Sequence, residues 1–96
     1  MDEDETEFAS MKVVEQLERC LELARQVGYG IRHEWLDSSG GGACEIGGKR
    51  WIFVDLAQSP AEQLDQVVEA IYGEPGLAEI GLPEEVQSLF DNRRAA

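Results

Sequence analysis

The stretch GGGACEIGGKRWIFVDLAQSPAEQ, residues 40–63, decides the fold of this chain. It joins a glycine-rich entry, a short strand, a Gly47-Gly48 turn, a long apolar strand and the start of a helix. Two consecutive glycines permit the positive φ angles of a type I′ turn, which connects neighbouring antiparallel strands. The stretch therefore predicts a β-hairpin that leads into a helix.

A two-residue turn also predicts which residues of the hairpin face each other. The facing pairs are Ile46 with Lys49, Glu45 with Arg50, and Cys44 with Trp51. The middle pair places opposite charges directly across the two strands, which stabilises this register. We therefore expect strands over residues 43–46 and 49–56.

The helix after the hairpin has a clear start in the sequence. Ser59 stands at the N-cap position, Pro60 at the first helical position and Glu62 at the third, a pattern typical of a capping box. Apolar residues then recur at helical spacing, namely Leu64, Val67, Val68 and Ile71. This pattern predicts a helix over residues 60–72.

The remaining segments complete a small α+β domain. Helical periodicity spans residues 8–27, a strand is expected over 30–36, and a last helix over 83–92. The expected fold is an N-terminal helix, a three-stranded antiparallel sheet with a tight hairpin, and two C-terminal helices, in the order α-β-β-β-α-α. We expect residues 1–7 to be a disordered acidic tail and residues 8–96 to form the single domain.

Composition and charge restrict the classes of function. Twenty acidic residues against eight basic ones give a net charge of −12, which repels nucleic-acid phosphates and anionic lipid surfaces. We therefore expect neither nucleic acid nor a membrane as a partner. The acidic start of the chain does not match a secretory signal, and the sequence has no apolar run of transmembrane length. These features predict a cytoplasmic protein.

Three polar residues are candidates for chemistry, and we treat His33, Cys44 and Asp55 as one possible polar site. Residues 33–37 spell HExxD, which is close to the HExxH of zinc peptidases, but that motif requires a helix and this segment is expected to be extended. A Cys/His pair can also generate a thiolate nucleophile. Neither arrangement is complete, so we expect no catalytic residue, no bound metal and no cofactor. Cys20 lies on the apolar side of the first helix and is expected in the core.

The aromatic residues of the expected sheet form a candidate interaction surface made of Trp35, Trp51 and Phe53. The strand over 49–56 is apolar on both faces, whereas a strand covered on one face alternates more cleanly. This face is therefore expected to form a homodimer interface or a peptide groove. The alternative is an ordinary core under the C-terminal helix.

The hairpin and the helix after it resemble a group of short uncharacterised bacterial proteins. The matching features are the glycines of residues 40–42, Cys44, Gly48-Lys49, the apolar residues 51–55 and Ala61-Glu62-Gln63. The resemblance covers about a third to a half of the chain and implies no known activity.

A weaker resemblance is to minimal zinc-peptidase folds, in which a hairpin-rich sheet precedes the helix that carries HExxH. The comparable helix here has neither histidine, and Gln63 stands at the position of the glutamate. This resemblance implies a degenerate metal-dependent hydrolase scaffold.

Taken together, these features predict a small acidic, non-enzymatic protein-interaction or regulatory module that acts as a homodimer. Its further partner would be a basic or apolar protein segment. The alternatives are the degenerate hydrolase scaffold and a docking subunit of a larger complex.

Overall fold

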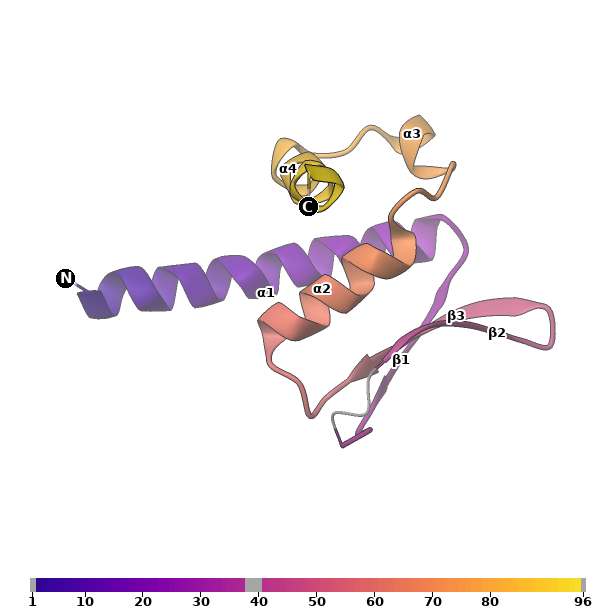
Figure 1. Cartoon of the computed structure of the whole chain (residues 1–96), viewed down its shortest axis with the longest axis horizontal. Coiled ribbons are helices and arrows are strands. Elements are labelled where there is room, and N and C mark those ends of the chain that lie inside the picture. The colour runs from indigo at the N-terminus through magenta and orange to yellow at the C-terminus, as the bar shows by residue number, and fades with distance from the viewer. Residues whose placement is uncertain (1, 38–40, 96) are drawn as a thin grey trace.

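The computed structural model describes residues 2–37 and 41–95, and in it the helices lie along one side of a three-stranded sheet (Figure 1). The helices of this described part are α1 (Asp2–Gln26), α2 (Pro60–Ile71), α3 (Leu77–Ile80) and α4 (Glu84–Ala95). Its strands are β1 (Gly30–Glu34), β2 (Gly42–Ile46) and β3 (Lys49–Asp55). The α+β class predicted from the sequence is confirmed.

The β2–β3 hairpin has the predicted turn and register. Gly47 and Gly48 have φ angles of 59° and 82°, as a type I′ turn requires. The three predicted facing pairs are all present: Ile46 with Lys49, Glu45 with Arg50, and Cys44 with Trp51. Gly41, just before β2, lies so close to the Phe53 carbonyl oxygen that no side chain would fit there.

The prediction of a purely antiparallel sheet was wrong. The strand order is β1-β3-β2, with β2 antiparallel to β3 but β1 parallel to it. Successive strands alternate in direction along the chain, as they do in a simple meander. Here, however, β2 does not pair with β1: it pairs with the opposite side of β3, at the other edge of the sheet. The physical reason is that the apolar β3 is buried best in the centre, whereas β2 is almost wholly exposed and suits an edge.

The helices also differ from the prediction in number and length. α3 is an additional short helix between the two predicted C-terminal helices. α1 begins at Asp2, so it takes in the acidic segment that was expected to be a disordered tail. With 25 residues, α1 extends beyond the other helices at its N-terminal end (Figure 1).

The start of α2 confirms the predicted capping box. The Glu62 amide donates to Ser59 Oγ at 3.2 Å, and the Ser59 amide donates to Glu62 Oε1 at 3.0 Å. Two of the amides that a helix start leaves without a helical partner are thereby satisfied. The geometry fixes the point at which the chain leaves the sheet and turns onto α1.

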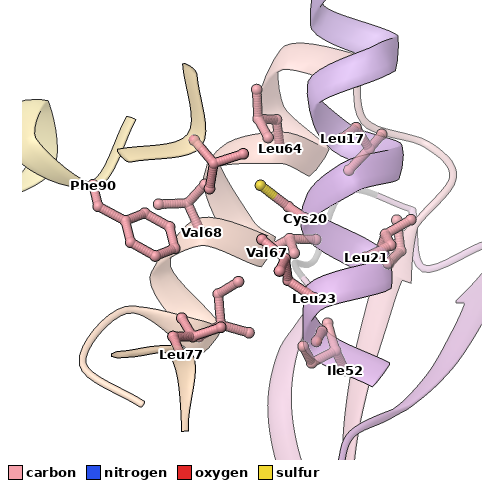
Figure 2. Close-up of a cluster of buried hydrophobic side chains, with 14 residues drawn as sticks. Leu17, Cys20, Leu21, Leu23, Ile52, Leu64, Val67, Val68, Leu77 and Phe90 are labelled. Atoms are coloured by element: carbon pink, nitrogen blue, oxygen red, sulfur yellow. The ribbon is translucent and has the colours of Figure 1, made fainter. Parts of the chain in front are cut away.

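The core lies between α1, α2, α4 and the helix-facing side of β3 (Figure 2). Cys20 lies at its centre, fully buried as predicted, with its sulfur directed toward α2. Leu23 is also buried, whereas Val14 is 40% exposed. α1 packs against both α2 and α4, so its buried arc is wider than the sequence pattern indicates.

Arg50 joins the hairpin to the helical layer. Its guanidinium donates to the Val27 carbonyl oxygen at 2.6 Å and to Glu74 Oε2 at 2.8 Å, and it lies over the Tyr29 ring. The hydrogen bond with Glu74 is the main cause that raises the Arg50 pKa. Arg50 faces Glu45 across the hairpin as predicted, but its ion pair is made with Glu74.

Two isoleucines on neighbouring strands provide a test of this packing. Ile52 is fully buried and Ile46 is 56% exposed. We expect Ile52→Ala to lower the free energy of unfolding by about 2–5 kcal/mol, because it leaves a cavity in the core between the sheet and the helices. Ile46→Ala should change it by no more than about 0.5 kcal/mol. Urea denaturation of both variants measures the difference, and equal losses would contradict the assignment of faces.

Candidate functional site

The side of the sheet that faces away from the helices is the candidate functional surface. Along β3, Ile52 and Val54 point into the core, while Trp51 and Phe53 point to the opposite face and are half-buried. No described helix covers that opposite face (Figure 1). By strand register, this open sheet face consists of Gly30, Arg32, Glu34, Gly42, Cys44, Ile46, Lys49, Trp51, Phe53 and, buried at the end of β3, Asp55.

Trp51 is held at the centre of the open sheet face by its neighbours. Its ring lies on Gly30 of β1, where an added Cβ would come within 2.6 Å of two ring carbons. Lys49 Nζ lies 4.7 Å from the ring centroid and Arg32 Cζ lies 6.0 Å from it. The tryptophan is therefore bordered by two cations, an arrangement that cation–π attraction stabilises.

The open sheet face differs in charge from the rest of the chain. Its solvent-accessible side chains include two cations, Arg32 and Lys49, and one carboxylate, Glu34, which gives them a formal charge of +1; the other carboxylate on this face, Asp55, is buried. Arg32 and Glu34 form an ion pair at 3.0 Å. The whole chain carries −12, and most of its acidic residues lie in the helices. The open sheet face is thus a locally basic and aromatic region of an acidic protein.

Trp35 is separated from the other two residues of the predicted aromatic surface. The parallel register pairs Gly30 with Trp51 and Glu34 with Asp55, so Trp35 lies beyond the end of the paired strands. Five residues along a strand correspond to about 16 Å. Trp35 is 68% exposed at that end of the sheet. Trp51 and Phe53 share the open sheet face, and Trp35 belongs to a different part of the surface.

His33, Cys44 and Asp55, the predicted polar site, do not converge. His33 is paired with Val54 and therefore points to the helix side, whereas Cys44 is paired with Trp51 on the open sheet face. The two residues also lie on opposite edge strands, with β3 between them. A proton transfer from the thiol to the imidazole requires hydrogen-bond distance, which this placement does not provide.

Asp55 has a structural role at the end of β3. Its side chain is buried, and Oδ1 accepts hydrogen bonds from the Leu36 amide at 3.0 Å and the Ala57 amide at 2.9 Å. One carboxylate oxygen therefore joins the segment after β1 to the segment after β3. Asp55 therefore holds the chain together at this point and is not part of a polar site with His33 and Cys44.

The HExxD segment does not have the geometry of a zinc motif. His33 and Glu34 lie in β1, and Asp37 follows the strand with a φ angle of 56°. Two ligands spaced four apart share a face only in a helix. Within residues 2–37 and 41–95, no three His, Cys, Asp or Glu side chains come together as a metal site. None of the helices in this part of the chain is long and apolar enough to cross a bilayer.

The two cysteines have opposite environments. Cys20 is buried between α1 and α2 (Figure 2), and burial raises the pKa of its thiol to about 11, with a smaller contribution from the Glu85 carboxylate. Cys44 is exposed on β2. The neutral thiol of Cys20 is therefore a packing group, and only Cys44 is open to reagents.

Sequence reasoning identified Trp51 and Phe53 but missed the residues that surround them. Lys49 could have been found, because residues two apart on a strand share a face. Gly30 and Arg32 could not, because they reach Trp51 only through the parallel pairing of β1 with β3. That pairing joins segments that no local pattern in the sequence connects.

Comparison with known protein families, curated proteins and solved structures found no match to this chain. The resemblance to short bacterial proteins therefore stays a prediction from the motifs in residues 40–63. The argument for function depends on the geometry of the open sheet face.

The role of Asp55 can be tested with two substitutions. We expect Asp55→Ala to lower the free energy of unfolding by about 1–3 kcal/mol, because the Leu36 and Ala57 amides lose their acceptor. Asp55→Asn keeps an acceptor oxygen and should cost less. Thermal and urea denaturation measure both variants. Equal stability of Asp55→Ala and the unaltered chain would contradict a structural role for the carboxylate.

The environments of the two cysteines predict their reactivity. In the native protein, a thiol reagent such as DTNB should modify Cys44 rapidly and Cys20 only after unfolding. Burial raises the Cys20 pKa from its ordinary value of 9.0 to about 11, so the fold favours the neutral thiol. Its contribution to stability is fully present below pH 9 and is lost as the pH rises through 11. Cys20→Ala should remove that part of the alkaline destabilisation, and equally fast labelling of both thiols would contradict the burial of Cys20.

Proposed function

We propose that this chain is a small, non-enzymatic protein-interaction module that acts as a homodimer and binds a segment of another protein on its open sheet face. The observation that supports the proposal is the pair Trp51 and Phe53, which lie side by side along β3 on a face without a helical cover. Large aromatic side chains contribute strongly to protein–protein binding when a partner removes them from water.

The size of the open sheet face favours a short segment as the ligand. Strands of five to seven residues extend about 17–23 Å, and three strands span about 10–14 Å. A surface of this size accommodates one helix or one extended peptide. A stable contact between two globular proteins needs roughly 800 Å² from each partner, which is more than this face alone offers.

The charge of the open sheet face indicates the chemistry of that segment. The sequence alone predicted a basic or apolar partner, because the whole chain is acidic. At Trp51, however, Lys49 Nζ lies 4.7 Å and Arg32 Cζ 6.0 Å from the ring centroid. A segment that combines an apolar anchor with Asp or Glu complements this face, whereas a basic segment would meet like charges.

The proposal can be tested by selection from a displayed library of random peptides. We expect the selected peptides to combine an aromatic or aliphatic residue with at least one acidic residue, and to bind at least tenfold more weakly to Phe53→Ala. Binding to the Trp35→Phe chain should change the fluorescence of the remaining Trp51, because the peptide covers its ring.

A matched pair of charge reversals gives the control. Lys49→Glu should change the selected peptides from acidic to basic, because the reversed side chain lies beside Trp51. Lys12→Glu makes the same change of charge on the exposed surface of α1 and should leave the selection unaltered. If the library yields no peptide that depends on Phe53, or if both reversals act alike, the open sheet face is not the binding surface.

A further inference from the structure

The outer edge of β2 is an unpaired strand edge in the described part of the chain. β2 lies at one side of the sheet order β1-β3-β2, and its residues from Ala43 to Ile46 are exposed. An exposed edge strand offers a row of backbone amides and carbonyls to another strand. Proteins commonly protect such edges with proline, charged side chains, a bulge or a covering loop, and the one residue of these kinds in β2 is Glu45.

The turn determines which backbone groups point outward from this edge. In a two-residue hairpin the residues next to the turn, Ile46 and Lys49, exchange both hydrogen bonds, and hydrogen-bonded pairs then alternate along an antiparallel ladder. Cys44 therefore bonds to Trp51 of β3, while the amides and carbonyls of Ala43 and Glu45 point away from β3 toward the free edge.

We infer that two copies of this chain pair through their β2 edges, in antiparallel register with Ala43 opposite Glu45 of the second copy. This inference rests on the homodimer of the proposed function. The register joins the two outward-pointing residues of each copy and forms on the order of four backbone hydrogen bonds. Cys44 then lies opposite Cys44 of the second copy, with Cα atoms about 4.5 Å apart.

The two neighbouring registers are less favourable. A shift in one direction places Glu45 opposite Glu45 of the second copy, and like charges directly across a ladder are destabilising. A shift in the other direction places Ala43 opposite Ala43 and moves Glu45 against Gly41, which lies outside β2. Only the register with Ala43 opposite Glu45 gives the outward-pointing amides and carbonyls of both residues hydrogen-bond partners within β2 of the second copy.

This pairing has a consequence for the binding surface. Facing residues in a ladder share a side of the sheet, so the helices of both copies lie on one side and both open sheet faces lie on the other. The dimer forms one continuous six-stranded sheet, which doubles the exposed aromatic surface. Each copy carries −12, so mutual repulsion opposes the dimer and added salt should strengthen it.

The register can be tested by placing opposite charges at Ala43. Ala43→Lys puts a lysine opposite Glu45 of the second copy at two symmetric positions and should lower the dimer dissociation constant roughly tenfold. Ala43→Glu puts like charges there and should raise it by a similar factor. The double variant Ala43→Glu with Glu45→Lys should restore dimerisation. Analytical ultracentrifugation over a concentration series measures all of them.

Ala78→Lys and Ala78→Glu are the matched controls, because Ala78 is exposed on α3 and the same charges there are remote from the β2 edge. They should change the dissociation constant only slightly, through net charge. If the Ala43 and Ala78 variants behave alike, the copies do not pair in this register.

Cys44 supplies a second, independent measurement. Copper-phenanthroline accepts two electrons from two thiols, which release two protons and form a disulfide. It should link the unaltered chain and Cys20→Ala into covalent dimers, but not Cys44→Ser. Cys44 also lies on the open sheet face, so two copies that meet through these faces could form the same disulfide. Crosslinking through Cys44, together with a dissociation constant that does not respond to the charge at position 43, would show such a face-to-face contact. That result would overturn edge pairing.

The outcomes separate this inference from the proposed function. A monomer at every concentration and salt level would overturn both the edge pairing and the homodimer. A dimer that is insensitive to charge at Ala43 would overturn only the edge pairing. Binding of acidic peptides to the open sheet face is measured separately.

Discussion

The two-glycine turn between β2 and β3 is the constraint on which the rest of the structure depends. Gly47 and Gly48 both have positive φ angles, and this turn type sets the register of the hairpin. A slip of one residue would exchange the two faces of β3, so that Trp51 and Phe53 would point at the helices. The division of the molecule into a helix-covered core and an open sheet face therefore begins at the turn.

Two polar residues at the ends of β3 then fix how the hairpin joins the rest of the molecule. Arg50 binds the end of α1 and Glu74 beyond α2, while Asp55 binds the segments that follow β1 and β3. Hydrogen bonds to charged groups contribute more than neutral ones, and these four hydrogen bonds are all partly shielded from water. Between these two polar residues, Ile52 and Val54 bury apolar surface against the helices.

The same arrangement separates charge across the molecule. Most acidic residues lie in helices on one side of the sheet, and the opposite side has Lys49 and Arg32 beside Trp51. This distribution gives the chain two unlike surfaces. In the proposed function, the open sheet face is the surface that binds a ligand with an apolar group and a carboxylate.

The sequence by itself determined the local elements. The glycine turn, the capping box at Ser59 and the apolar spacing of α2 depend on residues close together in the chain, and all three are present as predicted. Only the tertiary structure decided that β1 lies beside β3 rather than β2. That choice depends on which strand gains most from burial at the centre, and it alone brings Gly30 and Arg32 to Trp51. It also separated His33 from Cys44, because the faces and edges of a sheet depend on pairing between segments that are distant in the sequence.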